Sequence, residues 1–139
     1  MDKIGEPPAG FAPHFRKSPL TDPWEPLYSR KADGVVLLGT WLRPPHTNAR
    51  GFAHGGLISA LADNAMGLSC VEQTGGATSF VTVNLAVDFL GSARIGQWLE
   101  IATAFVRLGK TLSFAQCFVT ADGEPIARAN ATFRAVPRV

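Results

Sequence analysis

The segment from Asn48 to Asn64 constrains the fold of this chain more than any other. It begins as a polar loop and becomes a pattern of helically spaced apolar residues after His54-Gly55-Gly56: Leu57, Ile58, Leu61, Ala65 and Leu68. Paired glycines are costly at a helix start unless a bare backbone is needed there. The first turn of a helix has unpaired N–H groups and partial positive charge, which suit a carbonyl oxygen that becomes negative during a reaction.

Three polar side chains accompany this helix start. Asp63 has apolar neighbours on the expected helix, so its carboxylate is either solvated on the outer face or placed for chemistry. Asn48 and His54 precede the helix, where Asn48 can cap a turn and His54 can serve as a structural hydrogen-bonding group. Together, these groups and the amide-rich helix start suit acyl transfer or hydration of an acyl group.

The spacing of these groups resembles a known signature. Asn48, His54-Gly55-Gly56 and Asp63 are arranged as in hotdog-fold acyl-CoA thioesterases of the phenylacetate-degradation (PaaI-like) type. The stretch Thr82-Val-Asn-Leu-Ala-Val-Asp-Phe-Leu is similar to the strand that follows the helix of that family. The resemblance covers roughly residues 34–136. It implies an α+β hotdog fold, in which a five-stranded antiparallel sheet wraps round one long central helix.

Hydrophobic periodicity predicts a matching order of elements: one strand, one helix, then four strands joined mostly by short turns. The helix is expected over residues 55–72, and the strands over residues 34–43, 78–90, 97–107, 111–120 and 124–136. The dipeptide Asp122-Gly123 predicts a two-residue hairpin before the last strand. Small apolar residues on one face of that strand predict close approach of the helix: Ala127, Ala129 and Ala131.

The strand at residues 78–90 alternates most clearly. We expect five apolar residues to share one face: Val81, Val83, Leu85, Val87 and Phe89. Thr82 is expected on the opposite, polar face. This strand is therefore predicted to bury one side only.

Residues 1–33 are interpreted as an N-terminal proline-rich arm, and residues 34–139 as the hotdog thioesterase domain. Six of the ten prolines lie before residue 30, which excludes helix core and central strand from most of the arm. Its apolar residues favour packing on the domain surface or on a partner. Its function is not readable from the sequence.

The resemblance implies an acyl-CoA thioesterase that hydrolyses an acyl- or aryl-CoA thioester to the free acid and coenzyme A. The same resemblance implies that Asp63 acts as general base on water or as nucleophile, and that the Gly55 amide polarises the thioester carbonyl. It also implies that Asn48 holds the attacking water or the thioester and that Thr82 lies beside the water, although a structural role for Thr82 is also open because Thr favours strands. His54 is expected to orient the loop or the substrate.

Substrate-binding roles are expected for five further residues: Gly56, Phe80, Arg94, Arg107 and Lys110. The basic residues suit the phosphates of coenzyme A, although charged residues at turns are usually just solvated. No cofactor is expected, because coenzyme A is part of the substrate. No metal site is expected either, since no ligand spacing such as His-x3-His or Cys-x2-Cys occurs.

A site shared between two subunits follows from helix geometry. Gly55 and Asp63 are eight residues apart, which is about 12 Å along a helix at 1.5 Å per residue. A carbonyl held at Gly55 is therefore out of reach of Asp63 on the same helix. We expect a homodimer with two equivalent sites, and the resemblance further suggests a dimer of dimers, that is, a homotetramer.

Composition and charge restrict the classes of protein to which this chain can belong. The net charge of +2, without a basic run, argues against nucleic acid, and no apolar run is long enough for a membrane span. Without an apolar signal segment, a cytoplasmic location is expected. Cys70 and Cys117 are interpreted as free buried thiols. Two alternatives stay open: a hotdog acyl-CoA hydratase or dehydratase, and a non-catalytic acyl-CoA-binding domain.

Overall fold

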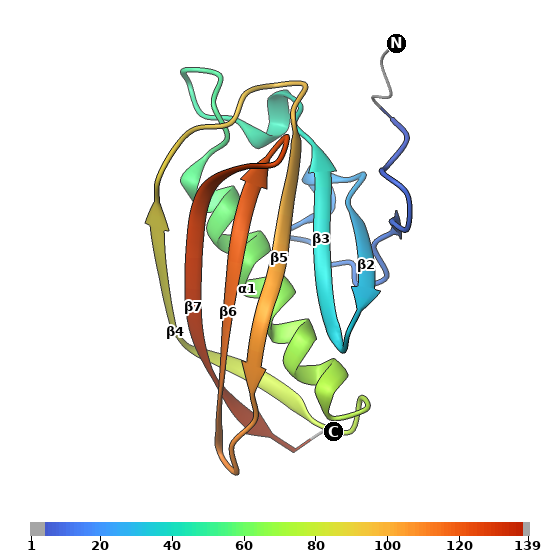
Figure 1. Cartoon of the computed structure of the whole chain (residues 1–139), viewed down its shortest axis with the longest axis vertical. Coiled ribbons are helices and arrows are strands. Elements are labelled where there is room, and N and C mark those ends of the chain that lie inside the picture. Colours follow the sequence, from blue (N-terminus) through green and yellow to red (C-terminus); the bar gives the residue numbers. More distant parts are fainter. Residues whose placement is uncertain (1–4, 138–139) are drawn as a thin grey trace.

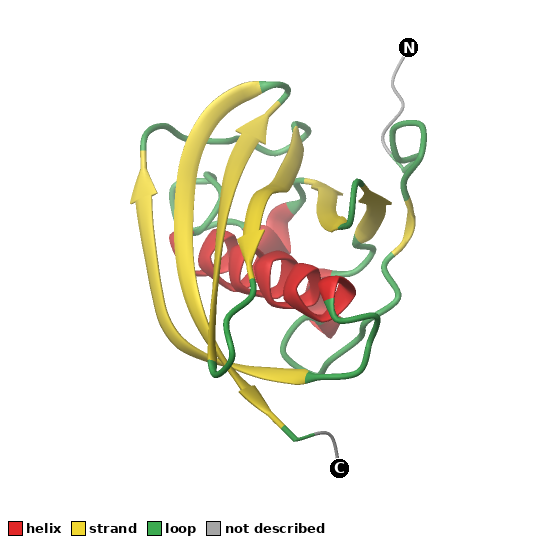
Figure 2. Cartoon of the chain, turned by 60° about the horizontal axis from the view of Figure 1, so that its bottom comes forward, coloured by secondary structure: helices red, strands yellow, loops and turns green. Residues whose placement is uncertain are grey.

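One long helix, α1 (Gly55–Gln73), lies against a curved antiparallel sheet in the computed structural model, which describes residues 5–137 (Figure 1). The sheet has seven strands in the order β1-β2-β3-β5-β6-β7-β4. Their bounds are β1 Ala12–Pro13, β2 Tyr28–Ala32, β3 Val35–Trp41, β4 Ser79–Phe89, β5 Trp98–Arg107, β6 Leu112–Ala121 and β7 Glu124–Val136. Two short 3-10 helices are η1 (Asp22–Trp24) and η2 (Pro44–His46). Figure 2 shows the sheet curling round α1, and the predicted hotdog arrangement is confirmed.

The core lies between α1 and the concave face of the sheet. The predicted row of small residues on β7 is buried, and each of Ala127, Ala129 and Ala131 is at most 3% exposed. Short side chains in this row leave room for the larger helix residues Leu61 and Met66, which are also buried. No helix within residues 5–137 is both long and apolar enough to cross a membrane.

The predicted strand count of five is wrong, because β1 and β2 lie in the proline-rich segment. Tyr28–Ala32 contains no proline and pairs with β3 through a tight turn at Asp33-Gly34. Both turn residues have positive φ, 53° at Asp33 and 78° at Gly34, as a primed hairpin turn requires. The same dipeptide signal forms the predicted hairpin at Asp122-Gly123, where φ is 47° and 86°. Part of the N-terminal segment is therefore built into the sheet.

The predicted single apolar face of β4 is also wrong. A β-bulge between Thr82 and Asn84 inserts an extra residue and shifts the alternation. Leu85 and Val87 pack against the core, whereas Val83 is 56% exposed. On the other side of the bulge the inward positions are Phe80 and Thr82. The bulge thus places a hydroxyl group, instead of a valine, beside α1.

The two cysteines are free and buried, as predicted. Burial raises the pKa of the Cys70 thiol to about 11 and that of the Cys117 thiol to about 12. Both side chains therefore act as small apolar groups in the core.

Candidate functional site

The start of α1 is capped by a histidine. The His54 Nδ1 atom accepts a hydrogen bond from the Gly56 N–H at 2.8 Å, which is the usual role of an N-cap side chain. The Gly56 amide is therefore occupied. The Gly55 amide donates no hydrogen bond to any residue that the structure describes. Gly55 thus presents a free N–H at the positive end of the helix dipole.

The loop before α1 is held by Asn48. Its Oδ1 atom accepts hydrogen bonds from the backbone N–H groups of Arg50, at 2.9 Å, and Phe52, at 3.2 Å. These are the contacts of a turn cap. An isolated bridge joins Phe52 to Arg94, which brings Arg94 to the same end of the molecule as Gly55.

His46 fixes this loop to the N-terminal segment. Its Nε2–H donates to the Trp24 carbonyl at 2.8 Å, and its Nδ1 accepts from the Arg43 N–H at 2.9 Å. The His46 carbonyl also accepts a hydrogen bond from the His54 N–H. Burial lowers the pKa of His46, so the ring is neutral in this position. The sequence left this histidine unassigned, and the structure gives it a positioning role at the helix start.

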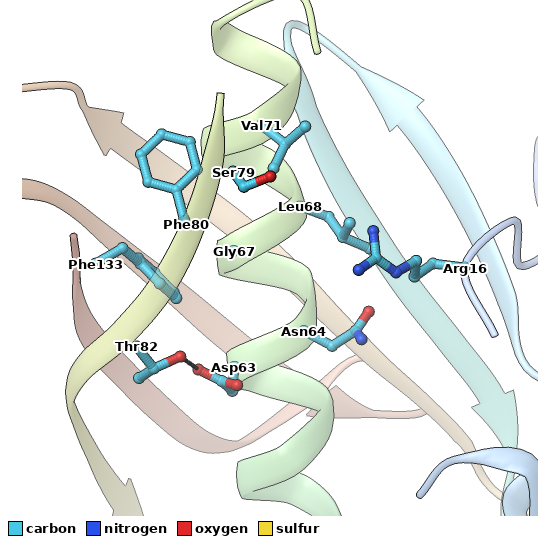
Figure 3. Close-up of a pocket in the computed structure, with 10 residues that line it drawn as sticks. All are labelled: Arg16, Asp63, Asn64, Gly67, Leu68, Val71, Ser79, Phe80, Thr82 and Phe133. Atoms are coloured by element: carbon cyan, nitrogen blue, oxygen red, sulfur yellow. Dashed lines mark hydrogen bonds between the residues drawn. The ribbon is translucent and has the colours of Figure 1, made fainter. Parts of the chain in front are cut away.

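Asp63 lies half-buried on the third turn of α1, beside β4. The Thr82 hydroxyl donates to Asp63 Oδ1 at 2.6 Å, which is a short bond of the charge-assisted kind (Figure 3). Asp63 Oδ2 accepts no hydrogen bond from the described residues. One carboxylate oxygen is thus fixed and the other is open to a ligand.

Both side chains line a cleft of about 440 Å³ between α1 and β4. Figure 3 shows the lining residues, which are Arg16, Asp63, Asn64, Gly67, Leu68, Val71, Ser79, Phe80, Thr82 and Phe133. Phe80, a predicted substrate-binding residue, is among them. A second cavity of about 470 Å³ lies beside the helix start and includes His54 and Gly56.

The structure divides the remaining predicted residues between the two ends of the sheet. Gly55, Asn48 and Arg94 lie together at the helix start. Arg107 ends β5, and Lys110 lies in the turn to β6 at the opposite end of the sheet (Figure 1). One chain therefore does not bring these two basic residues to the free Gly55 amide. Within residues 5–137 no cluster of three His, Cys, Asp or Glu side chains could hold a metal ion.

The N-terminal segment contributes to the cleft, which sequence reasoning missed. Arg16 lines it, and buried His14 forms a hydrogen bond through Nε2 to Asn64 Oδ1 at 3.1 Å. The two bonded residues are fifty positions apart, and the proline-rich segment has no periodicity that predicts the contact.

A curved antiparallel sheet round one helix, with a glycine-rich helix start and a helix carboxylate in a cleft, defines a hotdog-fold enzyme. Residues 50–127, more than half of the chain, match the family model described as "Thioesterase superfamily". The chain belongs to this superfamily. The prediction of a thioester hydrolase is thereby confirmed at the level of the family.

Two relatives show the same likeness in sequence. A Pseudomonas aeruginosa protein named "Putative esterase PA0474" is 37% identical over 127 residues, which are 91% of this chain and 95% of that protein. Human acyl-coenzyme A thioesterase 13 is 35% identical over 105 residues, which are 73% of each chain.

Solved structures share the fold. Protein smu.793 from Streptococcus mutans, bound to acetyl CoA, has a TM-score of 0.67 and 27% identity, over 76% of this chain and 83% of that one. A hypothetical thioesterase from Streptococcus pneumoniae, solved with coenzyme A, has a TM-score of 0.73 over 92% of this chain and 97% of that one. Its identity of 22% supports the fold alone.

Proposed function

We propose that this protein is a PaaI-like acyl-CoA thioesterase that hydrolyses acyl- or aryl-CoA thioesters. One observation carries the proposal: the Asp63 carboxylate is fixed by Thr82 in an open cleft, while the helix that bears it starts with a free Gly55 amide. A carboxylate can activate water, and a free amide at a helix start can stabilise a developing oxyanion.

In the proposed reaction a water oxygen bonds to the thioester carbonyl carbon as Asp63 takes one of its protons. The carbonyl oxygen becomes negative and accepts a hydrogen bond from the Gly55 amide. The carbon–sulfur bond then breaks, and the thiolate leaves with little need for acid because a thiol has a modest pKa. The products are a free acid and coenzyme A, with the abstracted proton returned to solvent or to the thiolate.

Direct attack by Asp63 through an acyl anhydride is the second path. A single turnover in ¹⁸O-water separates the two, because a general-base path places the label in the product acid at once. The anhydride path with water attack on the carboxyl carbon of Asp63 instead leaves the label in Asp63 after the first turnover. Thr82 supports the base role by holding one oxygen of Asp63 and leaving the other to face water.

The proposed site is completed by a second subunit. Asp63 lies about 12 Å along α1 from Gly55, too far for direct attack or one-water activation on the same carbonyl. Two antiparallel helices side by side would bring each Asp63 near the Gly55 of the partner. β4 is an edge strand that pairs only with β7 within the described chain, so its free edge suits pairing with a second β4.

A dimer of dimers is supported by the outer face of the sheet. Buried and exposed residues alternate along β6, so its exposed aromatic residues lie on the face away from α1. Apart from Phe89, whose ring lies beside Gly55, the large apolar residues that are at least 40% exposed on β4, β5 and β6 are Val81, Val83, Phe105, Leu112, Phe114 and Phe118. Covering this face with another dimer would remove them from water.

Coenzyme A is proposed as the carrier, supported by the acetyl CoA bound to the Streptococcus mutans relative. Arg94 suits a phosphate contact near the helix start, because it is exposed and adjoins the Phe52 loop. Arg107 and Lys110 lie at the far end of the sheet, so we propose that they contact coenzyme A only where it is bound at a site shared with a second subunit.

The test is a panel of acyl- and aryl-CoA thioesters assayed by thiol detection and mass spectrometry. We expect free thiol and free acid in stoichiometric amounts, and no release with Asp63→Asn. Addition of water to an enoyl-CoA without thiol release would instead identify a hydratase. Binding without any turnover would identify an acyl-CoA-binding domain.

A further inference from the structure

A single cationic side chain borders the cleft that contains Asp63. Arg16 is exposed and forms no hydrogen bond or ion pair with any residue that the structure describes. Its neighbour Lys17, by contrast, pairs with Glu25 at 3.3 Å. Figure 3 shows Arg16 approaching α1 from the side opposite Phe80 and Thr82, with its guanidinium directed toward Leu68. The cleft thus has a free positive charge on one wall.

The backbone that carries Arg16 is anchored next to Asp63. His14 is 2% exposed, its ring bonds to Asn64 Oδ1, and its N–H donates to the Leu27 carbonyl at 2.9 Å. Asn64 adjoins Asp63 in the helix. Arg16, two residues after this anchor, is therefore held at a defined position relative to the carboxylate.

Half of the residues that line the cleft are glycine or apolar, and of these Leu68 is the one toward which the Arg16 guanidinium points: Gly67, Leu68, Val71, Phe80 and Phe133 (Figure 3). Asp63 and Leu68 are five residues apart, which is about 7.5 Å along the helix axis and about 140° round it, at 1.5 Å and about 100° per residue. A methylene chain that starts at a thioester beside Asp63 must therefore pass over Asn64 and Gly67, which line the same cleft, to reach the Arg16 guanidinium. A guanidinium at its far end is the preferred partner of a carboxylate, which it binds through two parallel hydrogen bonds.

We propose that Arg16 selects acyl-CoA substrates whose acyl chain ends in a carboxylate, such as adipoyl-CoA. This inference rests on the proposed thioesterase function and adds the chemical class of the acyl group. The phosphates of coenzyme A are a second source of anionic oxygen. They are separated from the thioester by the whole pantetheine arm, which places them away from a group beside Leu68, only about one and a half helical turns from Asp63.

The experiment compares kcat/KM for adipoyl-CoA and hexanoyl-CoA, which have equal chain length and differ in the terminal carboxylate. In the native protein the ratio should favour adipoyl-CoA. Arg16→Gln should lower this ratio about tenfold, through KM, as expected for a partly solvated ion pair with two hydrogen bonds. Arg16→Lys should retain part of the preference for adipoyl-CoA, because it keeps the positive charge. Lys17→Gln removes the same charge outside the cleft and is the matched control that should keep the ratio.

Pantetheine thioesters of the same two acids separate the two anionic sources. If Arg16 binds the acyl carboxylate, its effect on the ratio persists without the nucleotide. An equal loss for both CoA thioesters, with no loss for the pantetheine thioesters, would assign Arg16 to a phosphate and overturn the proposal. A native ratio that Arg16→Gln leaves unchanged would overturn it too.

Failure of the proposed function gives a different result, namely no cleavage of either thioester. Selectivity can then be tested by binding alone. Calorimetry measures the affinity of adipoyl-CoA and hexanoyl-CoA for the Asp63→Asn protein, with and without Arg16→Gln. Equal affinities in both backgrounds would contradict the role of Arg16, and an Arg16-dependent preference for adipoyl-CoA would support it.

Discussion

Asp63 is the residue on which the proposed chemistry depends. Asp63→Asn should lower kcat by about a hundredfold or more, because an amide neither takes a proton from water nor attacks a thioester. The Thr82 hydroxyl can still donate to the new side-chain oxygen, so affinity for an acyl-CoA should change little. Steady-state kinetics and calorimetry measure the two quantities. Thr82→Val removes only the hydrogen bond to the carboxylate, so it should lower kcat less than Asp63→Asn does. Near-native turnover in folded Asp63→Asn would show that Asp63 takes no part in the reaction.

His46 links acid stability to the loop before α1. Burial lowers its pKa below the ordinary value of 6.5, so below that pH the unfolded chain binds more protons than the folded one. The free energy of unfolding should therefore fall as the pH drops through about 6.5. His46→Gln should be less stable at about pH 7.5, by about 1–3 kcal/mol for lost hydrogen bonds. It should also lose less stability on going to about pH 5.5, which urea unfolding at both pH values measures. An equal loss in both proteins would show that His46 does not titrate on unfolding.

Residue roles were less predictable than residue positions. The sequence pattern singles out Asn48, His54 and Asp63 as candidate site residues but leaves their structural and chemical roles open. The structure shows the Asn48 oxygen capping a turn and the His54 ring capping α1. Such roles depend on which donor lies within hydrogen-bond distance, and residue spacing alone does not determine this. Arg16 was missed because its proximity to Asp63 exists only after folding.

At the scale of elements, the start of α1 supports a second test. Gly55→Val should lower kcat/KM by about 10²–10³, the typical cost of one lost oxyanion donor, because a side chain blocks approach to the amide. A Cβ atom at Gly55 would lie 3.2 Å from the ring of Phe89, which is 52% exposed and free to move. The fold should therefore survive, as circular dichroism would show. Full activity in folded Gly55→Val would mean that the carbonyl binds elsewhere.

The main elements were predictable because each one buries a continuous face along its own length. Periodicity gave α1 and strands β3 to β7 within a few residues of their bounds. It failed at β4, where a bulge between Thr82 and Asn84 shifts the alternation of inward and outward residues. No residue type in the sequence signals this bulge. Periodicity also failed at β2, where surrounding prolines obscured the Asp33-Gly34 hairpin signal. Both failures affect the site, since the bulge turns Thr82 inward and the N-terminal segment supplies Arg16.

For the whole molecule, the central expectation is that one chain does not make a complete site. The free Gly55 amide and the Asp63 carboxylate are separated by about 12 Å of rigid helix, which no side-chain rotation can close. A dimer that pairs the free edges of β4 supplies each amide with the carboxylate of the partner. Loss of activity on dilution to monomers should follow, and light scattering with an activity assay measures both together.

Subunit exchange tests this arrangement directly. Gly55→Val and Asp63→Asn are each expected to be nearly inactive, because every site in either homodimer is damaged. A mixed dimer has one doubly damaged site and one site with both native groups. Equal amounts exchanged at random give about half mixed dimers, so about a quarter of native activity should return. Each variant taken through the same exchange alone is the control and should stay inactive. Mixed dimers, verified by mass spectrometry, that remain inactive would contradict the shared site, as would a stable monomer with full activity.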